Sequence, residues 1–328
     1  MQLAIRLYKY LLFLLLQLGV AAAFADPMQG DEADWLQTMA FAAHQTDYSG
    51  VFVYQSGGRV EMSRITHVSD EDGEHERLEG LGEGKREIVR SNDQVWLYTE
   101  GRRVRVEKRQ LSRAFPALLP AQISILKENY SVRQEEETEV AGYHAHAVVF
   151  QPKDNLRYTR KMWAHNDSGL LLKAAVLDDR GYIIEQYAFM QLSINGNIDR
   201  KWISREKLSA LEPQPQSAPR PTGEPMLPPS GWQVDALPSG FKKIMEMRRL
   251  FRDSKEPIIH LVFSDGLAGI SVFIEKVNGQ TRLNSGLAGQ GAVHVYNRIV
   301  ADSLVTVVGE VPARTVIQVA DSVRYAGQ

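Results

Sequence analysis

Between residues 48 and 211, hydrophobic and polar residues alternate with a period of two, which is typical of strands with one buried face. Val51 and Val53 oppose Phe52 and Tyr54, and Gly57-Gly58 gives a two-residue hairpin turn before the chain returns. One helix, with apolar residues at helical spacing around Leu36, precedes them. The pattern predicts a long antiparallel meander with strands near 51–54, 60–68, 85–90, 94–99, 102–109, 143–150, 157–165, 170–177 and 182–192.

One apolar stretch interrupts this meander. Phe115 to Tyr130 is apolar, is broken by Pro116 and Pro120, and stands between polar strands. Proline removes a backbone donor and fixes φ, so no long helix or strand is expected here. We expect a lid or short helices that lie across the sheet.

The late strands at 170–177 and 182–192 carry apolar residues on both faces, whereas a sheet with one face in water alternates cleanly. Something therefore covers the second face. Either the lid and the N-terminal helix pack on it as ordinary core, or they roof an apolar cavity able to take acyl chains. The candidate lining residues of such a cavity are Trp96, Phe115, Leu118, Leu119, Trp163 and Phe189.

A proline-rich run divides the chain. Glu212 to Ser230 holds seven of the 14 prolines, a density that favours a semi-rigid polyproline spacer over strands or helices. A long loop inside a single domain is the alternative. We expect a linker at 212–230 between a first lobe at 26–211 and a second lobe at 231–328.

The second lobe is smaller. Ile258 to Phe263 and Leu267 to Glu275 form a predicted hairpin, two further strands follow at 292–300 and 304–309, and Pro312 opens a final helix. A small sheet backed by one helix is an α+β domain. The overall fold class is thus α+β.

The N-terminus resembles an export signal. Arg6 and Lys9 precede an apolar stretch from Tyr10 to Val20, and Ala23-Phe-Ala25 offers a cleavage site. An uncleaved anchor is the alternative, but the apolar stretch is about half the ~20 residues of a spanning helix. We expect residues 1–25 to be a signal peptide that is cleaved after Ala25, and the mature protein to be exported to the periplasm. The chain has no cysteine, and its net charge of −2 lacks the basic balance of a nucleic-acid binder.

Candidate catalytic and metal-binding residues are few. Ser239 and Lys242 have S-x-x-K spacing but sit in a Pro-Gly turn, and His144 and His146 share one strand face without a third ligand nearby. We expect surface or packed side chains at both places. Basic residues at 102–109 and 242–252 favour solvated strand faces over phosphate sites. We predict neither an enzyme nor a cofactor.

Several stretches in both lobes resemble the MucB/RseB family, periplasmic negative regulators of the envelope-stress sigma factor. The likeness lies in SGVFVY, GKREIVR, MWAHNDSGLLLKAAVLDDRGYIIEQYAF, LPSGF and LVTVVGEVPARTVIQVADSV, and most specifically in VFSDGLAGISVFIE at 262–275. The resemblance implies a first lobe built as a lipoprotein-carrier-like antiparallel half-barrel closed by helices. It implies a second lobe that helps bind the periplasmic part of a membrane-bound anti-sigma factor, shielding it from regulated proteolysis until lipopolysaccharide or a stray lipoprotein appears.

Within this resemblance, we expect the second lobe to be the main dock, at the hairpin around Phe263 and Asp265 and at the strand face around Phe273. The two lobes would grip one target together, which raises the effective concentration of each binding site for the other. A periplasmic lipid or lipoprotein carrier is the alternative function, which the first lobe alone would permit. Homo-oligomerisation stays open.

Overall fold

Eleven strands form one antiparallel sheet in the first lobe, following helix α2 (Met28–Gln45). The computed structural model describes residues 28–84, 86–92, 94–99, 102–106, 114–203, 230–249, 257–277 and 286–326. The strands are β1 (Tyr48–Ser56), β2 (Arg59–Asp70), β3 (Gly73–Gly80), β4 (Arg86–Ser91), β5 (Gln94–Thr99), β6 (Arg102–Val106), β7 (Tyr130–Val140), β8 (Tyr143–Pro152), β9 (Thr159–His165), β10 (Leu171–Leu177) and β11 (Ile183–Ile194).

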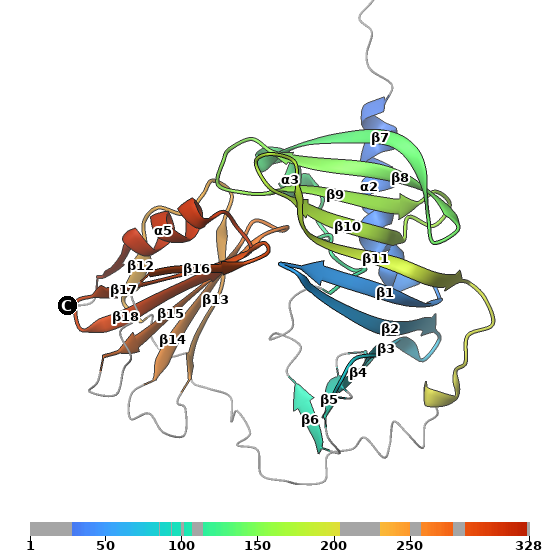
Figure 1. Ribbon diagram of the computed structural model, residues 1–328, viewed down its shortest axis with the longest axis horizontal. Coiled ribbons are helices and arrows are strands. Elements are labelled where there is room, and N and C mark those ends of the chain that lie inside the picture. Colours follow the sequence, from blue (N-terminus) through green and yellow to red (C-terminus); the bar gives the residue numbers. More distant parts are fainter. Residues whose placement is uncertain are drawn as a thin grey trace, which may run out of the picture. The chain divides into compact units, whose positions relative to one another are not determined.

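The strand order of the first sheet explains why the lid lies across it. The strands run β6-β5-β4-β3-β2-β1-β11-β10-β9-β8-β7, so two meanders meet where β1 pairs with β11 (Figure 1). β6 and β7 are successive in sequence but lie at opposite edges. The connection between them therefore has to cross the sheet, and it contains the short helix α3 (Ser124–Asn129).

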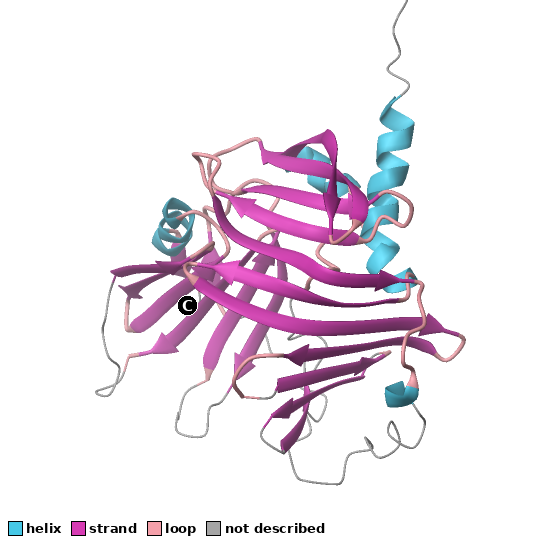
Figure 2. Ribbon diagram, turned by 45° about the vertical axis from the view of Figure 1, so that its right-hand side comes forward, coloured by secondary structure: helices cyan, strands magenta, loops and turns pink. Residues whose placement is uncertain are grey.

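The lid and α2 cover the same face of the first sheet. Leu36, Met39 and Ala43 of α2 are buried, and Gln37 Nε2 donates to the lid carbonyl of Ala121 at 2.9 Å. Figure 2 shows α2 lying along one side of the strands. Burial of these apolar side chains is what holds the helix to the sheet.

The other face is enclosed by the curl of the sheet. Edge strand β7 comes into contact with β11, and the hydroxyl of Tyr143 donates to the carbonyl of Leu192 at 3.4 Å. Inside this curl lies a cluster built on Ala145, Trp163 and Leu172. The two-sided apolar pattern of the late strands thus has two causes, the lid and α2 on one face and the curl on the other.

The second lobe contains a six-stranded antiparallel sheet in the order β13-β14-β15-β18-β17-β16. Its core joins this sheet to helix α5 (Ala313–Asp321), whose Val316, Val319 and Ala320 are fully buried. The strands are β13 (Lys242–Arg249), β14 (Ile258–Ser264), β15 (Gly269–Lys276), β16 (Gly286–Gln290), β17 (Val293–Val300) and β18 (Ser303–Gly309). A two-stranded sheet of β12 (Trp232–Val234) and β19 (Val323–Tyr325) completes the lobe, and a 3-10 turn, η2 (Lys201–Ile203), ends the first lobe's described part.

The α+β class with a large antiparallel sheet and a small α+β lobe is confirmed; the large sheet is open, and its edges do not pair into a closed barrel. The predicted strands were incomplete: β3, β7, β12, β13, β16 and β19 were not expected. The signal peptide and residues 212–229 of the predicted linker lie outside the described residues, so the division into domains stays a prediction.

Candidate functional site

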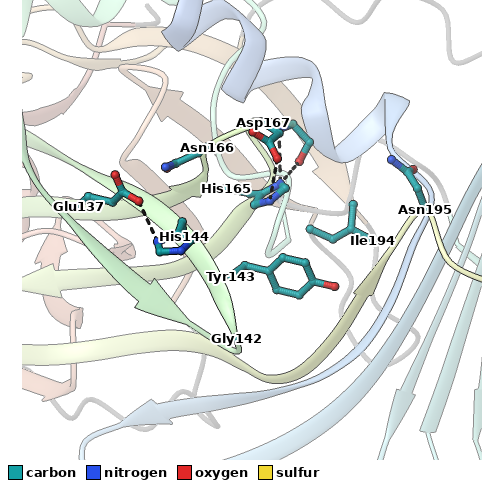
Figure 3. A pocket seen from close by; sticks show the side chains of 10 residues that line it. Glu137, Gly142, Tyr143, His144, His165, Asn166, Asp167, Ile194 and Asn195 are labelled. Carbon is teal, nitrogen blue, oxygen red and sulfur yellow. Dashed lines mark hydrogen bonds and ion pairs between the residues drawn. The ribbon is translucent and has the colours of Figure 1, made fainter.

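A polar groove lies where β7 ends and β8 begins, with a volume of about 600 Å³ (Figure 3). Glu137 Oε1 lies 2.9 Å from His144 Nδ1, and His165 Nδ1 lies 2.9 Å from the hydroxyl of Ser168. His144 is largely exposed. Across the described ranges, no three His, Cys, Asp or Glu residues are grouped to hold a metal ion.

Beneath the lid, an aromatic cluster lies on the centre of the first sheet. Phe115 packs on Phe52 of β1 and on Tyr187 and Phe189 of β11, with ring centroids 5.1–5.5 Å apart. Its ring is stacked on Tyr187 at an interplanar angle of 10°, and only 3% of Phe115 is exposed. Aromatic pairs of this kind stabilise beyond their buried area, so Phe115 anchors one end of the lid.

The predicted lipid-pocket residues do not all lie together. Phe115 and Phe189 are in contact under the lid, Leu119 and Trp96 are buried, and Leu118 is half-buried. Their role in lipid binding stays a prediction.

Trp163 lies on the opposite face. It pairs with Lys173, which pairs with Ala188, the neighbour of Phe189 on β11. Directly opposite residues share a face and successive residues alternate, so Trp163 faces away from the lid. There its ring lies 4.9 Å from Lys161 Nζ and 4.6 Å from Lys173 Nζ, beside a second groove.

The other end of the lid meets the β14–β15 hairpin of the second lobe. Asp265 occupies the turn, and its Oδ1 accepts from the backbone amides of Leu267 and Ala268 at 2.9 and 2.8 Å. Gly266 follows at φ 104°, a conformation that favours glycine. A Cβ there would lie 3.0 Å from Ile125, 3.2 Å from Leu126 and 3.5 Å from Pro120, so the turn packs directly on the lid.

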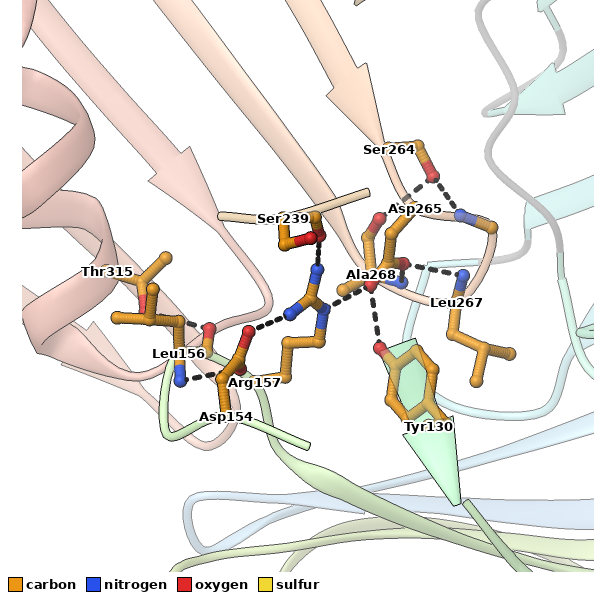
Figure 4. Close-up of polar contacts among 11 residues, drawn as sticks. Tyr130, Asp154, Leu156, Arg157, Ser239, Ser264, Asp265, Leu267, Ala268 and Thr315 are labelled. Atoms are coloured by element: carbon orange, nitrogen blue, oxygen red, sulfur yellow. Dashed lines mark hydrogen bonds and ion pairs between the residues drawn. The ribbon is translucent and has the colours of Figure 1, made fainter. Parts of the chain in front are cut away.

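The second carboxylate oxygen of Asp265 is held by the first lobe (Figure 4). Tyr130, the residue that ends the lid, donates its hydroxyl to Oδ2 at 2.8 Å, and Arg157 Nε donates to the same atom at 2.6 Å. Burial and the Asp265 carboxylate raise the pKa of Tyr130, which keeps its hydroxyl protonated as a donor. Arg157 also donates to Asp154 and to the carbonyl of Ser239.

This junction is buried. The side chains of Arg157 and Asp265 are 1% and 0% exposed. Removing one partner of such a buried pair typically costs 3–5 kcal/mol, because the remaining charge is left uncompensated. We call Tyr130, Arg157 and Asp265 the junction triad; it fixes the hairpin against the end of the lid.

Further contacts extend the same junction. Arg160 of β9 pairs with Glu310 at 3.1 Å, and the hydroxyl of Thr315 donates to the carbonyl of Leu156 at 2.8 Å. Ala292, fully buried, packs in a small cluster with Tyr158 and other first-lobe residues. The described residues from 36 onward accordingly belong to one compact unit.

The three predicted partner-binding residues fall in different places. Phe263 is in the core against α5, Asp265 is in the junction triad, and Phe273 is half-buried on the opposite face of the sheet. Phe263 and Asp265 are buried, whereas Phe273 is half-buried and stacked on His260, with ring centroids 4.1 Å apart at an interplanar angle of 16°. The role of the three residues in partner binding stays a prediction.

Around Phe273 the second sheet carries a band of uncharged residues on the face away from α5, which we call the open face; Glu275, two residues after Phe273, borders the band on the same face. Cross-strand pairing places its members on one face, because opposite residues point to the same side. Every member is half-buried, and the ten are Met245, Met247, His260, Val262, Ser271, Phe273, Val295, Asn297, Thr306 and Val308.

Sequence reasoning missed the junction triad. Arg157 and Tyr130 stand 108 and 135 residues before Asp265 along the chain, and no local sequence pattern connects the three residues. The only available signal was the apolar run that ends at Tyr130.

None of the helices in the described ranges is long and apolar enough to cross a membrane.

An open curved sheet with a lid, fixed to a smaller lobe that presents a largely uncharged face, defines a class of two-lobed binding proteins. Residues 31–207 match the MucB/RseB N-terminal domain, and residues 227–324 match the MucB/RseB C-terminal domain. The chain therefore belongs to the MucB/RseB family.

Named relatives span nearly the whole chain. The sigma factor AlgU regulatory protein MucB of Pseudomonas aeruginosa is 31% identical over 95% of this chain and 96% of its own length. The sigma-E factor regulatory protein RseB of Escherichia coli is 23% identical over 93% of each. A solved Pseudomonas aeruginosa MucA/MucB complex has a chain that aligns over 91% of this protein and 100% of its own length, with a TM-score of 0.70 and 28% identity.

Proposed function

We propose that this protein is a periplasmic regulator that binds the periplasmic region of a membrane-bound anti-sigma factor. Bound there, it shields that factor from regulated proteolysis and so represses the envelope-stress sigma factor. It acts by occupying its target and not by catalysis. The observation that carries the proposal is the family match across both lobes, together with a MucB chain of similar fold that was solved in complex with MucA.

The open face is the proposed main dock. Six of its ten half-buried side chains are apolar, and none of the ten is a carboxylate, lysine or arginine whose charge would have to be desolvated. Phe273 is the one large aromatic among them, and aromatic anchors near the centre of an interface commonly carry much of the binding energy. An extended or partly disordered segment of the anti-sigma factor suits such a flat surface.

Lipid is the proposed release signal, and the lid is the proposed place of lipid sensing. An acyl chain that entered between the lid and the sheet would replace contacts of Phe115 with Phe52, Tyr187 and Phe189. Burying ten methylenes is worth at most about 8 kcal/mol before ordering costs, enough for micromolar binding. Lipopolysaccharide or mislocalised lipoprotein acyl chains have this chemistry.

Export follows from the same proposal. The N-terminal segment with Arg6, Lys9 and the Ala23-Phe-Ala25 site would direct the chain across the inner membrane and be cleaved after Ala25. The mature N-terminus, Asp26, can be read by Edman sequencing of protein purified from the periplasm.

Direct binding tests the function. Mature protein is titrated with the purified periplasmic region of the anti-sigma factor from the same organism, and Kd is measured by calorimetry. Phe273→Ala should raise Kd by about tenfold or more, as loss of an interface anchor does. Tyr182→Ala, at an exposed first-lobe turn, is the matched aromatic control and should leave Kd unchanged. No binding by the unaltered protein would overturn the proposal.

A further inference from the structure

The lid has two fixed ends on different sheets. At one end Phe115 is held by Phe52, Tyr187 and Phe189 on the first sheet. At the other end Leu126 and Tyr130 hold the β14–β15 hairpin of the second lobe. Only fourteen residues separate these two attachments along the chain.

The lid between these ends is tightly packed and short. Leu119, Ile123 and Leu126 are buried at 5%, 4% and 0% exposure, and α3 occupies Ser124–Asn129. A buried segment with a helical turn has little slack to absorb a shift at one end, because packed interiors transmit strain. A displacement of the Phe115 side chain would therefore shift Tyr130 at the other end of the lid.

A second chain of contacts runs parallel to the lid. The ring centroids of Tyr187 and Tyr54 lie 4.7 Å apart, and the Tyr54 hydroxyl donates to Glu185 Oε2 at 3.2 Å. Glu185 is buried close to Arg160, which in turn pairs with Glu310 of the second lobe. The aromatic cluster under the lid thus reaches the second lobe by two routes.

In the second lobe, the β14–β15 hairpin is the element that a shift of the lid would displace. Asp265 Oδ1 organises the turn through two backbone amides while Oδ2 takes Tyr130 and Arg157, so a shift of the donors pulls on the carboxylate that shapes the turn. The turn joins β14 and β15, the two strands that carry His260 and Phe273 of the open face.

We propose that the lid is a mechanical strap that couples the aromatic cluster of the first sheet to the β14–β15 hairpin of the second lobe. An apolar chain entering under the lid moves Phe115, loosens the junction triad and so alters the strands of the open face. This last step rests on the proposed function; the coupling itself belongs to the protein alone and is measured without partner or lipid.

Hydrogen exchange followed by mass spectrometry on the full mature chain tests the coupling. Phe115→Ala removes the ring at the first-sheet end and should raise exchange of the peptide covering 264–268 by about fivefold. Asp265→Asn should in turn raise exchange across 118–130. Leu172→Ala, a buried truncation in the cluster with Trp163 on the opposite face of the first sheet, is the control for general destabilisation and should leave 264–268 unchanged relative to the rest of the second lobe.

Two results would overturn the strap. In one, Phe115→Ala changes exchange only inside the first lobe. In the other, Leu172→Ala raises exchange at 264–268 as much as Phe115→Ala does. Because no partner is present, failure here is distinct from failure to bind the anti-sigma factor.

Discussion

His44, at the end of α2, and Glu74 of β3 form an ion pair whose strength depends on pH. His44 Nδ1 lies 2.8 Å from Glu74 Oε1, and His67 Nε2 lies 3.3 Å from the same oxygen. Burial tends to raise the pKa of Glu74, but the hydrogen bonds from His44 and His67 outweigh it and hold that pKa well below 4.5. The hydrogen bond to Glu74 raises the pKa of His44 above 6.5, against the opposing effect of burial.

These shifts predict a pH window for stability. Because the folded pKa of His44 is raised, its contribution is complete below 6.5 and is lost as the pH rises through the folded value. Because the pKa of Glu74 is lowered, its contribution is present above 4.5 and is lost as the pH falls. The thermal midpoint of the protein should therefore decrease as the pH rises above 6.5, and His44→Gln should flatten that part of the profile. Parallel profiles for the two proteins would contradict this assignment.

At the scale of elements, the pairing of β1 with β11 joins the two meanders, and Gly50 is its tightest point. A Cβ on Gly50 would lie 2.5 Å from the carbonyl oxygen of Gln191 and 2.9 Å from the ring of Phe189. The bulge between Val51 and Phe52 follows directly, so the strand has already shifted its register here.

Gly50→Ala should therefore destabilise the first lobe by about 1–3 kcal/mol, the usual cost of overpacking. Gly82→Ala is the matched control, because nothing lies within 4 Å of its Cβ position. It should change the free energy of unfolding by less than about 0.5 kcal/mol. Chemical denaturation followed by Trp fluorescence measures both. Equal effects of the two substitutions would show that the close approach in β1 is not a constraint.

The elements that sequence could predict are those with an alternating or helical pattern. β5, β14, β18 and α5 were expected within a few residues, because each buries one regular face. β7 was missed because four glutamates hide its pattern; it is an edge strand, where charge is tolerated and prevents aggregation. β16, with the sequence GLAGQ, carries no pattern at all. The junction triad depends on contacts between distant residues, which local periodicity does not encode.

At the scale of the whole molecule, the predicted linker indicates where a protease should cut, and the junction between the lobes indicates that the two fragments should stay associated. Limited proteolysis should cut first within 212–229, giving fragments of about 20 and about 11 kDa. The two fragments should then elute together on gel filtration, because the junction triad and the Arg160–Glu310 pair still hold them. Asp265→Asn should make the fragments separate more readily. First cuts inside the strands would contradict the two-lobe organisation.

The central claim is that this protein protects an anti-sigma factor from regulated proteolysis. It is tested most directly in a reconstituted cleavage assay that contains the protease that cleaves the anti-sigma factor, the periplasmic region of that factor and the mature protein. The account predicts that excess protein slows cleavage, that added lipopolysaccharide restores it, and that Phe273→Ala weakens protection while Tyr182→Ala does not. Cleavage that proceeds equally fast with and without a large excess of the protein would contradict the claim and favour a lipid or lipoprotein carrier instead.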